Sequence, residues 1–384
     1  MRKKKHEAFL NAYLAENLGD DLFLHVIANR YKCTKFYVLA SSSYKGDLPS
    51  NICYDLSKFD EQLIEIENKI LFFLNSHNLP ARRLLPKGIR VLYRKRNYLS
   101  RKYGCNIFVI GSGFMERGKL IKNELRTDSA YFSRNVHLLG CNFGPYQSET
   151  FRAEYEKIFS KTAEVCFRDT YSYGLFEKLN NVRYESDIVF SFNEEVPNYF
   201  EDDRKYIVIS VVNLEKDGDV QNNSLSYYKL LADIAEWYLH QNIEVVFVGF
   251  CRQQGDDRTI GIISAMIPSN RIKLMHIVNY PDRDIHTILG LFKNADAVFA
   301  SRYHAGIIGM LFKRKTYFLA YSDKTINVLH DIDPHIKFID VNAKVTITAE
   351  KFIADYGYSI SDIKLKELKE SANRQFMILD EVLD

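Results

Sequence analysis

One short segment near residue 300 limits what this chain can fold into more than any other. An apolar run from Asn294 to Ala300 is followed by a polar stretch from Ser301 to Gly306, and a second apolar run then continues to Phe312. This order predicts a buried strand, a polar turn and an apolar helix. Ligands of open α/β sheets bind where the strands end, and a helix N-terminus there favours an anion. The segment therefore places Arg302 and His304 at a candidate anion site.

The same alternation of strands and helices runs through both halves of the chain, which is typical of parallel sheets. In the first half, the expected strands are 36–39, 105–110, 136–140 and 164–167, and the expected helices are 22–29, 63–74 and 154–161. In the second half, the expected strands are 205–212, 243–249, 271–275 and 294–300, and the expected helices are 227–241 and 284–293. We therefore expect an α/β fold of two Rossmann-like domains, with parallel sheets facing across a cleft.

The length of 384 residues also favours two domains over one. The polar stretch 192–205, with Pro197 and three consecutive acidic residues, is the best candidate linker. We therefore expect a first domain over residues 1–195, a second over 205–345, and a C-terminal helical segment over 346–384. Its final helix is expected at about 361–383.

Composition and cysteine spacing exclude several classes of protein. The chain is 46% hydrophobic and 26% charged, as in globular proteins with a buried core. Its six cysteines are scattered, with no CxxC pair and no cluster with histidine at metal-ligand spacing, so neither a metal site nor a disulfide framework is expected. No signal peptide and no apolar stretch of roughly 18 residues is present, which predicts a cytoplasmic protein.

The net charge of +3 is small, but one segment is strongly basic. Residues 82–102 carry nine lysines and arginines and no acidic residue. Three interpretations remain open: a solvated basic face, a surface for anionic lipid or a diphosphate group, and a nucleic-acid surface. No RNP-type motif or helix-turn-helix spacing accompanies the charge, so we expect no nucleic acid as a partner.

Two further turns could bind an anion. The turn from Asn17 to Asp21 precedes an apolar helix, whose first N–H groups could hold a phosphate, although its side chains could equally be helix caps. The turn from Gly111 to Gly113 follows a strand and lets the backbone approach a ligand, but it lacks the spacing of a dinucleotide fingerprint.

Arg168 stands at the end of another expected strand, followed by Asp169. A guanidinium binds a carboxylate or phosphate through two parallel hydrogen bonds, so this position suits an anionic substrate. A structural Arg–Asp ion pair is the alternative. If the two domains face each other, Arg168, Arg302 and His304 converge on one small anion.

Taken in order along the chain, these motifs resemble the polysaccharide pyruvyl transferase family from about Asn11 to Asp340. The most specific motifs are the segments 295–305 and 321–324, and Tyr303 stands where leucine is usual in the family. The other motifs are the Asn17-x-Gly19-Asp20 opening, Gly111-Ser-Gly113, Gly140 to Pro145, Phe167-Arg168-Asp169-x-x-Ser172, and Asp187.

The resemblance implies a GT-B-like fold, with the first domain on the acceptor side and the second on the donor side. It also implies that pyruvate passes from phosphoenolpyruvate to two sugar hydroxyls and forms a ketal, without a cofactor, metal or nucleotide. On this basis Arg168 and Arg302 hold the carboxylate and phosphate. His304 is a general acid with a pKa near neutrality that protonates the methylene carbon, and Asp20 is a base or a hydroxyl acceptor. The expected substrate-binding residues are Asn17, Gly19, Asp20, Ser112, Gly113, Ser301, Tyr321 and Lys324.

Two other functions stay open at this point. A nucleotide-sugar glycosyltransferase has the same two-domain shape, and a diverged member could bind glycans without catalysis. The acceptor sugar cannot be read from the sequence. The basic segment 82–102 is compatible with a lipid-diphosphate-linked acceptor and with peripheral contact at the inner face of a membrane.

Overall fold

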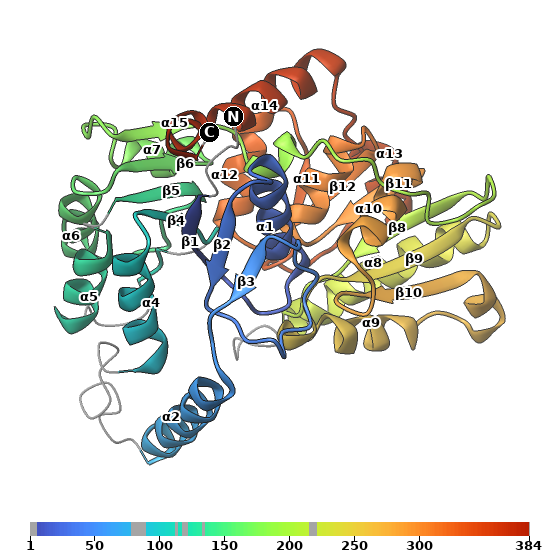
Figure 1. Cartoon of the computed structure of the whole chain (residues 1–384). Helices are drawn as coiled ribbons and strands as arrows, with labels where there is room; N and C mark the ends of the chain where they lie inside the picture. The colour runs from blue at the N-terminus through green and yellow to red at the C-terminus, as the bar shows by residue number, and fades with distance from the viewer. Residues whose placement is uncertain are drawn as a thin grey trace.

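The structure, a computed structural model, describes residues 6–77, 90–111, 114–116, 122–132, 135–214 and 221–383. Two parallel β-sheets form the centres of two α/β domains that lie side by side (Figure 1). The predicted fold class is thereby confirmed. No helix in the described part of the chain has the length and apolar character needed to cross a bilayer.

The first domain contains a parallel sheet in the order β3-β2-β1-β4-β5-β6-β7. Its strands are β1 (Glu7–Ala12), β2 (Lys35–Val38), β3 (Ile52–Tyr54), β4 (Cys105–Val109), β5 (Val136–Cys141), β6 (Glu164–Phe167) and β7 (Val182–Tyr184). The sequence analysis missed β1, although this strand lies inside the sheet, between β2 and β4. Only three of its residues, Ala8 to Leu10, are apolar and fully buried, and a run of charges precedes it.

The second domain contains a parallel sheet in the order β10-β9-β8-β11-β12-β13. Its strands are β8 (Tyr206–Ser210), β9 (Glu244–Gly249), β10 (Met275–Asn279), β11 (Ala297–Ala300), β12 (Lys315–Ala320) and β13 (Phe338–Asp340). The predicted strand at 271–275 was wrong, because a short 3-10 helix over Ser269–Leu274 precedes β10. As an edge strand, β10 leaves Ile277 half exposed and shows little apolar alternation.

Helices cover both sheets. In the first domain they are α1 (Leu18–Arg30), α2 (Lys58–Ser76), α4 (Val91–Lys102), α5 (Lys122–Phe132), α6 (Glu149–Phe159) and α7 (Thr170–Gly174), with a 3-10 helix η2 (Ile188–Ser191). In the second they are α8 (Gln221–Leu239), α9 (Asp256–Ser264), α10 (Ile285–Asn294), α11 (Tyr303–Leu311), α12 (Asp323–Ile332) and α13 (Ala349–Asp355).

The C-terminal segment crosses back to the first domain. It forms two helices, α14 (Asp362–Arg374) and α15 (Met377–Leu383), in place of the single helix predicted (Figure 1). Arg30 in α1 pairs with Asp380 at 2.6 Å, and the Gln375 side chain accepts a hydrogen bond from the Gly140 N–H at 2.9 Å. These contacts tie the end of the chain to the first sheet.

The two domains share one apolar interior. A single cluster of buried side chains extends from Phe23 of α1 through Ile188 of η2 to Leu289 of α10 and Ile307 of α11. Each Å² of apolar surface that is removed from water stabilises the fold by about 25 cal/mol, and this stabilisation does not depend on directional bonds. The residues at the junction therefore rest on a continuous packed core.

Candidate active site

The turn into α11 is built as the sequence predicts, with β11 before it and an apolar helix after it. The N–H groups of Ser301 and Arg302 donate to the Ser210 hydroxyl at 3.0 and 3.2 Å. Tyr227 donates its hydroxyl proton to Ser301 Oγ at 2.7 Å, and Ser301 is almost fully buried. Ser301, predicted to bind substrate, therefore holds the turn that presents Arg302 and His304.

The N-terminus of α1 meets this turn from the other domain. The Asn17 side chain accepts a hydrogen bond from the Gly19 N–H at 3.0 Å and so caps the helix. The Leu18 N–H donates to the Phe250 carbonyl of the second domain at 3.0 Å. Gly19 lies so close to His304 that a Cβ at this position would overlap the imidazole ring. Glycine is required here for the close approach of the two helices.

His304 lies between groups of both domains. Its Nε2 is 3.4 Å from Arg168 Nη1 and 3.9 Å from a carboxylate oxygen of Asp187, and its ring packs edge-to-face on Phe23. Burial lowers the pKa of His304 to about 3. The nearby Arg168 lowers this pKa further, whereas Asp187 raises it but does not offset the burial. The near-neutral pKa predicted for His304 was therefore wrong for the free site, where the ring is neutral.

Arg168 reaches the junction from the end of β6. Its guanidinium donates to Asn142 Oδ1 at 2.6 Å and to Asp187 Oδ2 at 2.7 Å. It also stacks over the ring of Tyr303 with 4.4 Å to the centroid. Arg168 thus takes part in a buried ion pair, one of the two alternatives weighed from the sequence, but with Asp187 as partner. The same side chain contacts the second domain through Tyr303 and His304.

Arg302 behaves differently from the predicted anion clamp. Its Nε donates to Asp256 Oδ2 at 3.0 Å, its Nη2 donates to Asp256 Oδ1, and its Nη1 donates to the Gln254 amide oxygen. Arg302 and Asp256 are both nearly inaccessible to solvent. Three of the five guanidinium N–H groups are therefore directed to side chains of its own domain.

Asp20 lies where the charges of the two domains meet. It follows Gly19 in the first turn of α1 and is half-buried. Arg168, Arg302 and Asp187 are all close enough to influence its ionisation. Burial raises the pKa of Asp20 to about 7, and the two arginines only partly offset that rise. Asp20 therefore exchanges its proton near neutral pH, unlike His304.

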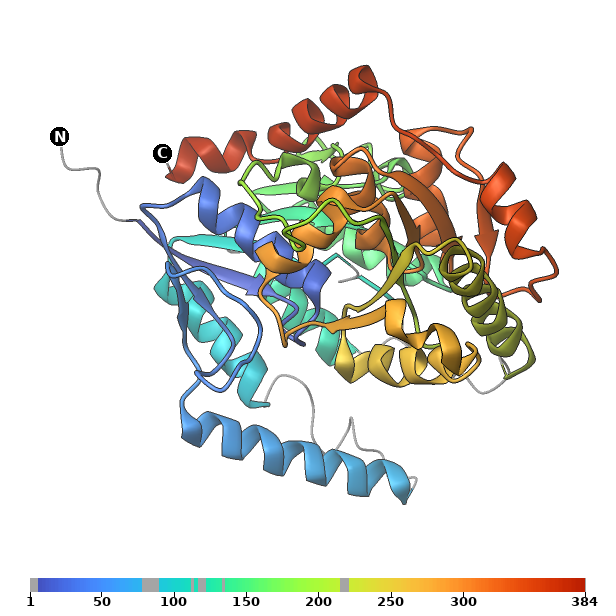
Figure 2. The same cartoon turned by 90° about the vertical axis from the view of Figure 1, so that its right-hand side faces the viewer.

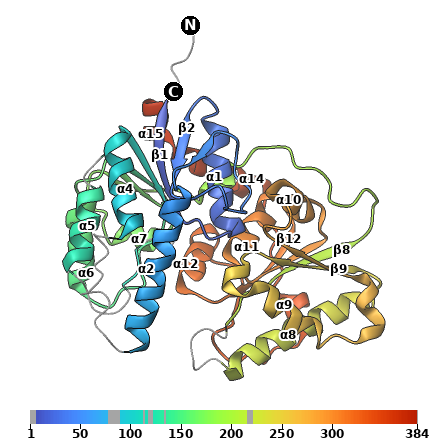
Figure 3. The ribbon, with the colours of Figure 1, turned by 60° about the horizontal axis from the view of Figure 1, so that its bottom comes forward.

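The two helix N-termini give this junction an anion-binding character. α1 and α11 both start beside the contact between Gly19 and His304, and Figure 3 shows the two helices at the centre between the domains. The positive end of a helix dipole favours an anion nearby, although the Leu18 and Gly19 N–H groups of α1 already donate to acceptors within the protein. Arg168 and Arg302 are each paired with a carboxylate, from Asp187 and Asp256 respectively.

The other residues predicted to bind substrate either follow β12 at the same edge of the second sheet or lie outside the described part of the chain. Tyr321 follows β12 and lies within electrostatic range of Arg302, and Lys324 lies in the first turn of α12. Ser112 and Gly113 lie outside the described residues. The sequence analysis missed the roles of Asn142 and Asp256. Asn142 lies within the turn 140–145 that was singled out, whereas no local pattern marks Asp256.

Part of the basic segment 82–102 is used inside the fold, and residues 82–89 lie outside the described residues. Lys95 pairs with Asp60 and Arg96 with Asp128, each at 3.1 Å. Arg94 and Arg101 are exposed on α4. Figure 2 shows α2 extending along the outside of the first domain, and its exposed apolar side chains are Phe59, Ile66, Ile70, Phe72 and Phe73.

Comparison with known proteins identifies the family. The model of the polysaccharide pyruvyl transferase family matches residues 17–323, while no curated protein matches significantly. Among solved structures, MnaA of S. aureus with UDP is similar with a TM-score of 0.53 and 9% identity over 98% of this chain and 96% of that chain. A UDP-forming trehalose-phosphate synthase of Burkholderia xenovorans in complex with glucose-6-phosphate has a TM-score of 0.52 and 8% identity over 98% and 99%. Anabaena HepE with UDP-glucose has a TM-score of 0.50 and 11% identity over 98% of each chain. These likenesses show the GT-B fold alone.

Proposed function

The chain belongs to the polysaccharide pyruvyl transferase family, and we propose that it transfers pyruvate from phosphoenolpyruvate to two hydroxyls of a glycan, forming a pyruvate ketal. One observation carries the proposal. Asp20, Arg168 and His304 come from both domains and lie together beside the contact between Gly19 at the start of α1 and His304 at the start of α11. Such a site combines the positive ends of two helices and Arg168 with Asp20, a group that can exchange a proton near neutral pH.

We propose that the donor anion binds beside the N-termini of α1 and α11, which pack together at the contact between Gly19 and His304. Arg168 lies against His304 and therefore faces the donor, while Arg302 is held by Asp256 and supports the turn. Lys324, at the same edge of the second sheet, supplies a further positive charge. No cofactor, metal or nucleotide takes part in the proposed reaction.

The ionisation of Asp20 supports its role as the acid. With a pKa of about 3 in the free site, His304 is a weak base, and the proposal requires that the negative charge of bound phosphoenolpyruvate raise this pKa. Protonated Asp20 donates its proton to C3 of phosphoenolpyruvate, and neutral His304 accepts the proton of the first sugar hydroxyl as its oxygen bonds to C2. The bond from C2 to the phosphate oxygen then breaks and inorganic phosphate leaves. The second hydroxyl bonds to C2, and its proton passes to the departing phosphate. This order reverses the roles that the sequence analysis gave to His304 and Asp20.

The proposal is tested by phosphate release from phosphoenolpyruvate in the presence of an acceptor glycan, with the ketal methyl group detected by NMR. His304→Ala is expected to lower turnover by about 10²–10⁴-fold, the usual contribution of a general acid or base. His276→Gln is the matched control, because His276 also bonds to a carboxylate but lies on β10, away from the junction. Near-wild-type turnover of His304→Ala would contradict the assignment.

Ligand binding separates this function from its alternatives. Phosphoenolpyruvate is expected to raise the melting temperature, whereas UDP and GDP are not. The reverse result would favour a nucleotide-sugar glycosyltransferase, a reading consistent with the UDP and UDP-glucose complexes of structural neighbours. Binding without any release of phosphate would indicate a non-catalytic glycan-binding protein.

We further propose that the protein works in the cytoplasm on a lipid-diphosphate-linked acceptor, in peripheral contact with the inner face of the membrane. Exposed Arg94 and Arg101, together with the apolar side chains of α2, support this proposal. Reversing the charge of both arginines is expected to weaken binding to anionic liposomes without changing turnover on a soluble acceptor. Unchanged liposome binding would contradict this role.

A further inference from the structure

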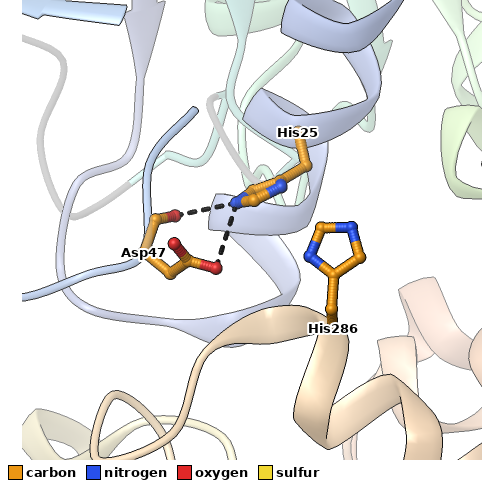
Figure 4. A group of neighbouring side chains, drawn as sticks. All are labelled: His25, Asp47 and His286. Atoms are coloured by element: carbon orange, nitrogen blue, oxygen red, sulfur yellow. Dashed lines mark hydrogen bonds and ion pairs between the residues drawn. The ribbon is translucent and has the colours of Figure 1, made fainter. Parts of the chain in front are cut away.

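We propose that His25, Asp47 and His286 form a binding site for a divalent transition-metal cation of the zinc type, at a second point where the two domains meet. Figure 4 shows the three side chains facing one another. His25 lies on α1, Asp47 in the loop after β2, and His286 in the first turn of α10. One candidate ligand atom from each residue lies within 4.8 Å of the other two.

The hydrogen bonds of the two histidines leave the correct ring nitrogens for a metal. His25 Nε2 is 3.0 Å from the Asp47 backbone carbonyl, and His286 Nε2 is 3.0 Å from a carboxylate oxygen of Glu194. Both acceptors are oxygens, so each Nε2 donates its proton and each Nδ1 keeps a lone pair. Metal-binding histidines are held in this way by a carbonyl or carboxylate behind them.

Among the described residues, the Nδ1 atom of His25 lacks a hydrogen-bond partner, and a bound cation would take that place. The residue is only 4% exposed. A buried nitrogen lone pair without a partner is costly. In Figure 4 the Nδ1 of His286 lies on the side that faces His25 and Asp47.

The surrounding backbone holds these groups in place but leaves an entrance. A carboxylate oxygen of Asp47 accepts a hydrogen bond from the Ile285 N–H at 3.0 Å, and the Asp47 N–H donates to the Tyr280 hydroxyl at 2.7 Å. The loop of the first domain is thus bonded to the start of α10 in the second. The side chains of Asp47 and His286 are 31% and 29% exposed, so a hydrated cation can reach them.

Two imidazoles and a carboxylate are ligands that suit zinc, with water in a fourth position. Zinc–ligand bonds of about 2.0–2.1 Å place tetrahedral ligand atoms roughly 3.4 Å apart. The candidate ligand atoms lie within 4.8 Å of one another, so the side chains must move closer together to reach this spacing around an ion. The ion would join α1 and the loop of the first domain to α10 of the second.

The test uses the full chain after removal of bound metal with a chelator. Zinc titrated at equimolar concentration is expected to bind as one ion per chain and to raise the melting temperature, and cobalt is expected to give the visible absorption of a tetrahedral site. His286→Gln should lose both effects. His276→Gln, which removes a partly exposed histidine bonded to Glu244 at 2.8 Å in the same domain, should keep them.

Asp47→Asn provides a second variant if His286→Gln does not fold by circular dichroism, and it should also lose the bound ion. The proposal would be overturned if the wild type binds no zinc or cobalt. It would also be overturned if the variants bind and respond as the wild type does, which would place the ion elsewhere.

Discussion

The two domains each deliver an arginine from the end of a strand, yet the two side chains are used differently. Arg168 extends across the junction and contacts Tyr303 and His304 of the other domain. Arg302 turns back to Asp256 and Gln254 of its own domain. Both are buried and both are paired with a carboxylate, so burial and charge alone do not separate them.

This difference indicates that the hydrogen-bond partners of each arginine, and not its position at the end of a strand, decide whether it can contact a substrate. Arg168 shares its donors between Asn142 and Asp187 and still lies against the catalytic candidate His304. The bidentate contact of Arg302 with Asp256 fixes the turn before α11. We therefore expect substitutions at Arg168 to affect chiefly catalysis, and substitutions around Arg302 to affect chiefly stability.

The largest expected effect is that of Arg168→Lys on activity. Lysine keeps the charge but loses the planar fork that contacts Asn142 and Asp187 and stacks on Tyr303. We expect kcat/KM for phosphoenolpyruvate to fall roughly 10³-fold. Arg302→Lys should lower activity less and the melting temperature more. Steady-state kinetics and thermal unfolding of both variants test this expectation. The comparison would be contradicted if Arg302→Lys lost more activity and Arg168→Lys had the lower melting temperature.

The next effect is the loss of stability in Asp256→Asn. This change leaves the buried charge of Arg302 without its counter-ion, and removing one partner of a buried pair costs about 3–5 kcal/mol. Chemical denaturation of the wild type and the variant, fitted with one shared m-value, would measure the difference in their free energies of unfolding. A loss below 1 kcal/mol, on the order of an exposed pair, would show that Arg302 does not depend on Asp256.

Gly19→Ala tests the contact between α1 and α11. A Cβ at Gly19 would overlap the His304 ring, so we expect a loss of about 1–3 kcal/mol in stability, together with lower turnover. Gly104→Ala is the matched control, because a Cβ there meets no atom within 4 Å. Equal stability and activity of the two variants would mean that the helices do not meet as described.

The smallest expected effect is the pH dependence of donor binding. With a pKa of about 7, Asp20 is neutral below pH 7 and becomes an anion above it, where it repels phosphoenolpyruvate. Affinity should therefore fall with rising pH, by up to about tenfold for each unit above 7. Titration calorimetry of Asp20→Asn should show a flatter profile. If the substitution leaves the pH dependence of phosphoenolpyruvate affinity unchanged, Asp20 does not lie in the donor site.

The strand, turn and helix around His304 could be predicted because local apolar patterning determines them, and ordered motifs sufficed to identify the family. The strand β1 was missed, because its apolar run is short and lies next to a charged terminus. The pairing of Arg302 with Asp256 and the low pKa of His304 could not be predicted either. Both depend on burial and on contacts between distant segments, which spacing along one chain does not reveal.

The most direct test of the central claim is a crystal structure of the protein with phosphoenolpyruvate. We predict electron density for the donor beside the N-termini of α1 and α11, in contact with Arg168 and His304 and with its methylene carbon facing Asp20. Density at another place, or no density at a saturating donor concentration, would contradict the account.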